Sequence, residues 1–361
     1  MTKNNIDKLA ELGTSAWLDD LSRDRLVSGN LKEVIDTKSV VGVTTNPSIF
    51  SSAMSTGTAY DADIAKLKEK GVDAAEAVYS LAMDDVRDAC DVFTEIFEKS
   101  EGKDGRVSIE VDPRISDDRE ATLAQARELW EKIDRPNLMI KIPATDGSLP
   151  AIADALAEGI SVNVTLLFSV DRYKEVIKAF KDGINRAHAA GKDVSTIHSV
   201  ASFFISRVDT EVDKRLEEIG SELALALRGK AGIANAQLAY ALFKEEFAGA
   251  DLPEGTNVQR PLWASTGVKN PEYPAWIYVT ELAGPDTVNT IPEDTIDAVL
   301  ENAEFNGDTL TNSKQEAQAI FEQLKEVGIN FDEVFSVLER EGVEKFVDAW
   351  QELLDSMSKR L

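Results

Sequence analysis

The sequence contains very little cysteine and histidine. Its 361 residues include one cysteine, Cys90, and two histidines, His188 and His198. One cysteine cannot form a disulfide within the chain, which fits a protein of a reducing compartment such as the cytoplasm. Two histidines and one cysteine are also too few for the usual zinc sites, so no metal site of this kind is expected.

Basic residues are scarce relative to acidic ones. The chain has 39 Lys and Arg against 65 Asp and Glu, a formal net charge of −26. Nucleic acids and anionic membranes attract basic surfaces, so neither is an expected partner. The same charge repels phosphorylated small molecules, so a phosphate site would require arginine or lysine placed locally.

Long hydrophobic runs are absent as well. No apolar stretch of the sequence approaches the length of a membrane span. The first residues, MTKNNIDKLAELG, lack the apolar run of a signal peptide. These observations favour a cytoplasmic protein.

Short apolar runs alternate with amphipathic segments along the chain. This alternation is typical of α/β proteins with parallel strands, and eight such strands close a (β/α)8 barrel. The expected strands are Ser15–Leu18, Val40–Val43, Arg106–Val111, Leu138–Ile142, Ser161–Thr165, Thr196–Phe203, Val258–Trp263 and Trp276–Thr280. The predicted fold class is therefore α/β, a single (β/α)8 TIM barrel over residues 1–361 with extra helices.

Two helical segments exceed the needs of a minimal barrel. Residues 213–249 are expected to form a helical insert, and residues 331–361 a C-terminal helical segment. The apolar stripe of the second segment is expected to pack across the barrel or against a partner. The stripe consists of Val334, Leu338, Val343, Phe346, Val347, Trp350 and Leu354. A monomer or a homodimer is the expected state.

Two expected strands place polar side chains where a plain core would have none. Side chains alternate across a strand, so Ser108, Glu110 and Asp112 share one face of their strand. Asn163 and Thr165 share a face of another. In a barrel the apolar faces should meet the helices, so these polar faces should point inside. Polar groups there are costly unless paired, and they are expected at the C-terminal mouth, where active sites of this fold lie.

A single lysine interrupts the apolar run Leu138–Pro143. One interpretation is an edge strand from which the Lys141 ammonium reaches water. The other is an amine held in an apolar setting, where burial disfavours the charged form and leaves a nucleophile. A nucleophilic amine is what Schiff-base chemistry with a carbonyl substrate needs.

Several motifs together resemble the transaldolase family. Residues 42–50, GVTTNPSIF, are similar to its N-terminal signature, and residues 139–145, MIKIPAT, to its active-site lysine signature. Three further segments follow in the family's order: VSIEVD at 107–112, NVTLLFS at 163–169 and SFFISR at 202–207. The long insert resembles the longer-chain bacterial and plant-like branch of the family.

This resemblance implies a role for each matching residue. Lys141 is similar to the Schiff-base lysine, and Glu110 with Thr165 to the pair that positions a water for proton transfer. Asn46 and Asn163 are similar to the residues that hold the dihydroxyacetone part of the substrate. The remaining pocket residues implied by the resemblance are Thr44, Ser202 and, for the phosphate, Arg207.

Two positions are less clearly matched. The family's acid/base aspartate ends the first strand, where this chain has both Asp19 and Asp20. Asp19 is favoured because it follows the last apolar residue of the strand, and Asp20 remains the alternative. A second part of the phosphate site is expected from Ser265, Thr266 and Lys269, although Lys269 also fits an ordinary solvated loop lysine.

The resemblance implies transfer of a dihydroxyacetone unit from sedoheptulose 7-phosphate to glyceraldehyde 3-phosphate, giving erythrose 4-phosphate and fructose 6-phosphate. This is a reaction of the non-oxidative pentose phosphate pathway, and its partners are sugar phosphates. No metal or organic cofactor is expected, because the lysine supplies the electron sink.

Other functions remain open at this point. The nearest alternative is a fructose-6-phosphate aldolase-like enzyme, whose group tends to be shorter and to carry an amide in place of Glu110. A catalytically silent acidic barrel would be expected to lack Lys141, Glu110 or Asp19, and the sequence has all three. A pyridoxal-phosphate barrel would need a phosphate cup and a pyridine partner that the sequence does not suggest.

Overall fold

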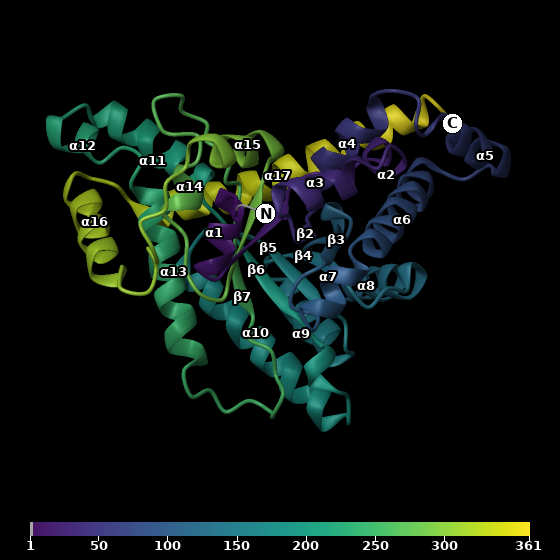
Figure 1. Cartoon of the computed structure of the whole chain (residues 1–361), viewed down its shortest axis with the longest axis horizontal. Helices are drawn as coiled ribbons and strands as arrows, with labels where there is room; N and C mark the ends of the chain where they lie inside the picture. The colour runs from purple at the N-terminus through teal and green to yellow at the C-terminus, as the bar shows by residue number, and fades with distance from the viewer. Residues whose placement is uncertain (1–2) are drawn as a thin grey trace.

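Short strands lie in the middle of the molecule, surrounded by helices (Figure 1), and they pair in sequence order and close on themselves. The computed structural model describes residues 3–361, and within them a barrel of eight parallel strands is closed by pairing of the first with the last. The strands are β1 (Thr14–Leu18), β2 (Gly42–Val43), β3 (Arg106–Glu110), β4 (Leu138–Pro143), β5 (Val162–Leu167), β6 (Ser199–Phe204), β7 (Arg260–Ala264) and β8 (Thr287–Ile291). The (β/α)8 fold class is confirmed.

Helices surround this barrel. From the N-terminus to β5 they are α1 (Asn5–Glu11), α2 (Arg23–Val27), α3 (Asn30–Lys38), α4 (Pro47–Ser55), α5 (Asp61–Lys70), α6 (Ala74–Val92), α7 (Thr94–Lys99), η1 (Pro113–Ile115), α8 (Arg119–Ile133) and α9 (Ser148–Ala157). After β5 they are α10 (Val170–Ala189), η2 (Val194–Thr196), α11 (Ser206–Ile219), α12 (Glu222–Ala226), α13 (Ala231–Phe247), α14 (Ile277–Thr280), α15 (Glu293–Asn302), α16 (Lys314–Glu326) and α17 (Phe331–Ser358).

The last strand is not where the sequence suggested. Trp276–Thr280 was expected to be β8, but this segment contains the short helix α14, and the strand lies at Thr287–Ile291. The expectation was wrong because the true strand contains polar residues although all of it is buried. Its sequence therefore does not resemble that of a core strand. One of these, Asn289, donates from Nδ2 to the carbonyl of Tyr278, 3.0 Å away, which ties the strand to the helix mistaken for it.

The strand register places three polar residues side by side. Glu110 on β3 lies opposite Lys141 on β4, and Lys141 lies opposite Asn163 on β5. Neighbouring residues of parallel strands point to the same face of the sheet. The apolar residues between them, including Ile109, Ile140 and Val164, share a hydrophobic cluster with α6, α8 and α9. The alternating strands therefore turn their apolar faces to the helices, as expected.

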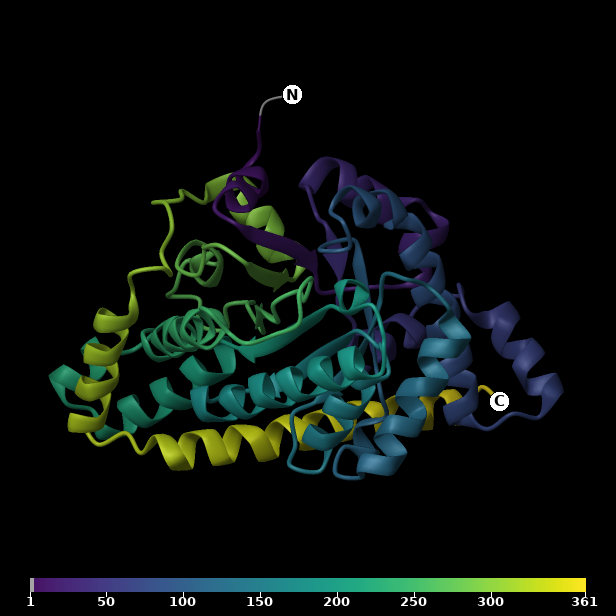
Figure 2. The same cartoon turned by 90° about the horizontal axis from the view of Figure 1, so that it is seen from below.

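Extra helices lie around the later strands. The segment 213–249 contains the end of α11 and all of α12 and α13, which precede β7. After β8 and α15 the chain forms α16 and the 28-residue helix α17. Figure 2 shows α17 as one long helix along the lower edge of the view, and in Figure 1 it passes partly behind other helices. No helix in the described part of the chain is long and apolar enough to span a membrane.

Helix α17 crosses the mouth of the barrel. It contacts η1, α4 and α11, which begin just after the C-terminal ends of β3, β2 and β6, and it contacts β5 directly. Gly342 allows part of this close approach, because a Cβ atom there would lie only 3.1 Å from the ring of Phe168. The last helix therefore covers the end of the barrel where active sites of this fold lie.

Candidate active site

Lys141 lies inside the barrel rather than at an edge. Its strand, β4, pairs with β3 on one side and β5 on the other, so the edge-strand interpretation was wrong. The side chain is buried, with 5% of its surface exposed. Its Nζ donates to the carbonyl of Thr45 at 3.0 Å and lies 3.3 Å from Oε2 of Glu110. The amine is thus held at a fixed point, with one carboxyl group beside it.

Glu110 is a carboxyl group in a setting that disfavours its charge. Burial raises the pKa of Glu110 to about 7, although the cations of Lys141 and Arg207 partly oppose the shift. Among residues 3–361, no group donates a well-aligned hydrogen bond to either carboxylate oxygen, and the buried hydroxyl of Thr165 is likewise unpaired. Buried polar atoms normally have a partner, so these oxygens on either side of Lys141 are available to a water or a substrate.

The strand that carries Thr165 is irregular at that residue. The pairing of β5 with β6 shifts register between Val164 and Leu167, and Leu166 has a φ of 61°. A bulky side chain in the left-handed region costs about 1–3 kcal/mol and persists only where the surroundings enforce it. Bulges of this kind redirect side chains and are common beside active sites.

A hydrogen-bonded chain links the polar residues of three strands. Ser202 on β6 donates from Oγ to Oδ1 of Asn163 at 2.7 Å, and Nδ2 of Asn163 donates to Oγ of Ser108 at 3.1 Å. All three residues are buried. The chain fixes the orientation of the Asn163 amide next to Lys141, so a hydroxylated ligand would meet a preset pattern of donors and acceptors.

The two aspartates after β1 have different surroundings. Thr44 donates from Oγ1 to Oδ1 of Asp19 at 2.9 Å, and burial raises the pKa of Asp19. Asp20 instead accepts a hydrogen bond of 2.7 Å from Nε of Arg25. Asp19 lines the same cavity as Lys141, whereas Asp20 does not. The geometry therefore favours Asp19 over Asp20 as an acid/base near the lysine.

A cavity of about 150 Å³ opens at the barrel mouth. Eight of the residues expected from the sequence line it: Asp19, Thr44, Asn46, Lys141, Ser202, Arg207, Ser265 and Lys269. Asn46 reaches it from the start of α4, where its Oδ1 accepts from the Ile49 amide at 3.0 Å. The other expected residues, Glu110, Asn163 and Thr165, are buried on the strands next to Lys141.

Two cationic residues, Arg207 and Lys269, line this cavity. Arg207 lies in the first turn of α11, and in the described part of the chain its buried Nη1 has no hydrogen-bond partner. Ser265 holds the neighbouring loop, because its Oγ lies 2.7 Å from Oγ of Ser206. Thr266 does not reach the cavity, since its hydroxyl donates to the carbonyl of Thr290 at 2.8 Å. Arg207 and Lys269 offer positive charge to an anionic ligand despite the acidic chain.

Comparisons with known proteins agree with this geometry. A family model described as Transaldolase/Fructose-6-phosphate aldolase matches residues 16–357. The chain belongs to this family. A protein named transaldolase from Mycolicibacterium paratuberculosis is 59% identical over 362 residues, covering 99% of this chain and 97% of that protein. Proteins of the same name from Mycobacterium tuberculosis (59%) and Mycobacterium leprae (58%) are similar over 99% of this chain and 97% and 96% of their own lengths, respectively.

Some cavity residues of this family member were not expected from the sequence. Thr290 on β8 lines the cavity and shares a hydrogen bond with Thr44, and it was missed because β8 was misplaced. Phe204 and Phe346 also line the cavity. Phe204 belongs to the SFFISR motif, which suggested no role for it, and Phe346 belongs to the apolar stripe of the C-terminal helix. Nothing local in the sequence indicates that Phe346 returns to the barrel mouth.

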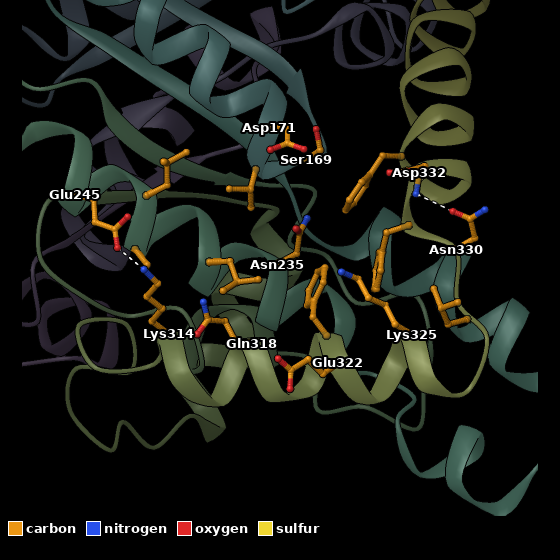
Figure 3. A pocket seen from close by; sticks show the side chains of 18 of the residues that line it. Ser169, Asp171, Asn235, Glu245, Lys314, Gln318, Glu322, Lys325, Asn330 and Asp332 are labelled. Atoms are coloured by element: carbon orange, nitrogen blue, oxygen red, sulfur yellow. Dashed lines mark hydrogen bonds and ion pairs between the residues drawn. The ribbon is translucent and has the colours of Figure 1, made fainter.

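A larger cavity, of about 930 Å³, lies elsewhere, between α10, α13, α16 and α17 (Figure 3). Its rim includes the ion pair of Lys314 and Glu245, and Asn235 lies between its walls (Figure 3). None of the active-site residues expected for the transaldolase family lines it. Size alone therefore does not identify the active site, whereas the smaller cavity gathers the lysine, the aspartate and the cationic groups at the barrel mouth.

Proposed function

We propose that this chain is a transaldolase that moves a dihydroxyacetone unit from sedoheptulose 7-phosphate to glyceraldehyde 3-phosphate. Erythrose 4-phosphate leaves and fructose 6-phosphate forms. The observation that carries the proposal is a buried lysine, Lys141, with a carboxyl group 3.3 Å from its amine and a second carboxyl, Asp19, on the same cavity. Membership of the family and relatives named transaldolase support it.

Imine formation begins with attack of the neutral Lys141 amine on the donor's ketone carbon. A C–N bond forms, and the carbinolamine then loses its hydroxyl group as water to give an iminium. The proton needed by the departing hydroxyl comes from Glu110 through a water that the Thr165 hydroxyl helps to hold. The raised pKa of Glu110 suits this role, because a useful part of the carboxyl is protonated near neutral pH.

Carbon–carbon cleavage follows at the iminium. The carboxylate of Asp19 removes the proton of the donor's C4 hydroxyl, the C3–C4 bond breaks, and its electron pair moves into the iminium to give an enamine. Erythrose 4-phosphate departs as an aldehyde. The enamine then attacks the aldehyde carbon of glyceraldehyde 3-phosphate, and Asp19 returns the proton to the new hydroxyl. Hydrolysis of the imine releases fructose 6-phosphate and restores the amine.

Binding groups hold the substrate in two places. Asn46, Asn163 and Ser202 present amide and hydroxyl groups to the dihydroxyacetone part. Arg207 and Lys269, together with Ser265, receive the phosphate. Arginine offers several donors in one plane, which suits phosphate oxygens. These roles require no metal or organic cofactor.

The family also includes fructose-6-phosphate aldolases, which release the three-carbon product instead of transferring it. Glu110 supports transfer, since the resemblance leads us to expect an amide at this position in the aldolases. We place the enzyme in the cytoplasm, where a single buried cysteine is no disadvantage, and as a monomer or homodimer.

The decisive experiment is borohydride trapping with fructose 6-phosphate, followed by mass mapping of the modified lysine. The adduct is expected on Lys141 and should be absent from Lys141→Ala, while Lys174→Ala, an exposed position on α10, should trap normally. The purified enzyme should then pass the three-carbon unit to erythrose 4-phosphate faster than it releases free dihydroxyacetone. Undiminished trapping in Lys141→Ala would overturn the lysine assignment, and release without transfer would make the protein an aldolase.

A further inference from the structure

One aromatic side chain of the last helix, Phe346, lies close to both Lys141 and Arg207. The ring of Phe346 on α17 lies 5.6 Å from Nζ of Lys141 and 5.9 Å from Cζ of Arg207. The residue lines the active-site cavity and is 5% exposed. Phe346 is therefore part of the wall between the amine and the arginine.

The guanidinium of Arg207 lies over two aromatic rings. Its Cζ lies 5.0 Å from the ring centre of Phe204 and 5.9 Å from that of Phe346. Within residues 3–361, Arg207 forms no ion pair within 4.0 Å, and its Nη1 is buried without a hydrogen-bond partner. Aromatic faces attract a guanidinium without occupying its N–H groups. The two rings can therefore fix the plane of Arg207 and leave its donors free for a ligand.

The position of the Phe346 ring is set on both sides along α17. On one side Gly342 packs against Phe168, where a Cβ atom would lie 3.1 Å from the ring. On the other side Trp350 packs against Tyr79 with ring centres 5.0 Å apart, and the Tyr79 hydroxyl donates to the carbonyl of Glu110 at 3.1 Å. The helix is thus anchored to the barrel before and after the residue, so the ring has a defined place in the cavity.

We propose that Phe346 is a positioning residue for Arg207 and thereby sets the preference of the site for phosphorylated sugars. This inference rests on the proposed function, and it adds α17 to the elements that build the phosphate site. Loss of the ring would release one face of the guanidinium. The arginine side chain would then become ordered only when the phosphate binds. This ordering costs free energy and weakens phosphate binding, although the positive charge remains.

The test compares variants at two phenylalanines of the same helix. Phe346→Leu keeps an apolar side chain but removes the aromatic face, and Phe346→Tyr keeps the face. Phe335→Leu is the matched control, because Phe335 packs on Phe331 (ring centres 5.6 Å apart) and does not line the active-site cavity. Three quantities are measured: KM for fructose 6-phosphate, the inhibition constant of inorganic phosphate, and the rate of borohydride-trapped imine from dihydroxyacetone, which has no phosphate.

In Phe346→Leu both phosphate-dependent constants should rise by about 2- to 30-fold, the range that a cation–π contact contributes. Imine trapping with dihydroxyacetone should change less than either constant. Phe346→Tyr should restore most of the phosphate affinity, and Phe335→Leu should match the wild type. Equal losses for dihydroxyacetone and for phosphate would overturn the proposal, since the ring would then act on the whole cavity. An unchanged phosphate constant would overturn it as well.

A double-mutant cycle tests the route through the arginine. In the Arg207→Ala background, Phe346→Leu should have little further effect on phosphate inhibition if the ring acts through Arg207. Additive losses would contradict this route. If Phe346→Leu has a reduced Tm, the same cycle is run with Phe346→Met, which fills the space with a flexible side chain. Wild-type enzyme that forms no imine with fructose 6-phosphate would instead refute the proposed function, so the two failures are distinguishable.

Discussion

Oε2 of Glu110 lies 3.3 Å from Nζ of Lys141, and the two residues are directly opposed on adjacent strands. Burial raises the pKa of Glu110 to about 7, so this carboxyl takes up a proton near neutral pH instead of remaining a permanent counter-ion. The pair therefore places a carboxyl that can donate a proton directly beside the amine, which is what imine formation needs.

The pH dependence of imine formation should follow Glu110. Its carboxyl is protonated below a pKa of about 7, so the rate of imine formation should fall as the pH rises above that value. Glu110→Gln should be slower by about 10²–10⁴-fold and should lose this ionisation. Rapid-quench borohydride trapping over a range of pH measures both effects, with the exposed Glu98→Gln as control. A full-rate Glu110→Gln enzyme with an unchanged profile would exclude Glu110 as the proton donor.

Asp19 and Asp20 should differ sharply when replaced. Asp19→Asn should still form the ketose imine at Lys141 but stall before cleavage, so borohydride would trap an adduct with the full donor carbon chain. Asp20→Asn should cleave at close to the wild-type rate, because Asp20 is engaged by Arg25 outside the cavity. Mass analysis of the trapped adducts distinguishes them. The reverse pattern would move the acid/base role to Asp20.

Arg207 should contribute mainly to phosphate binding. Arg207→Ala removes a charge-assisted contact, which typically contributes roughly 1.5–3 kcal/mol, or about 10- to 150-fold in KM for phosphorylated substrates. Steady-state kinetics with fructose 6-phosphate measure the change. Arg340→Ala, an exposed position on α17, is the control. Unchanged KM and kcat/KM in Arg207→Ala would place the phosphate elsewhere.

A buried tyrosine–aspartate pair should give stability a dependence on pH. The Tyr278 hydroxyl donates to Asp209 at 2.5 Å, and burial raises the pKa of Asp209 from 3.8 to about 6. Tyr278→Phe removes the donor, which raises that pKa further and destabilises the ionised carboxylate by about 1–3 kcal/mol. The decrease in Tm caused by Tyr278→Phe should therefore be largest at pH values above the raised pKa of Asp209, where the carboxyl is ionised. The decrease should become smaller as the pH falls through that pKa and the carboxyl takes up a proton. Equal decreases at acidic and alkaline pH would show that packing, not the charge, dominates.

The sequence predicted much of the site because the informative residues lie on the strands themselves. Lys141 interrupts an apolar run, and Glu110 and Asn163 alternate with apolar residues along their strands, so local pattern singled these residues out. Their roles came only from the resemblance to the transaldolase family. Local pattern was not sufficient for β8, whose buried face carries Asn289 and whose identity depends on pairing with β1. Local pattern also failed to predict that Phe346 lies at the barrel mouth. That position arises from long-range packing of α17, which the helical periodicity of the sequence does not indicate.

The position of α17 at the end of the element order has a consequence for how the enzyme comes into being. The ribosome delivers all eight strands, and with them Lys141 and Arg207, before it delivers Phe346. Domains often fold as they emerge during synthesis. A nascent chain with a closed barrel therefore holds its nucleophile already, but the guanidinium of Arg207 then rests on Phe204 alone. On our proposal that Phe346 positions Arg207, selectivity for phosphorylated sugars would be complete only once α17 reaches the barrel mouth.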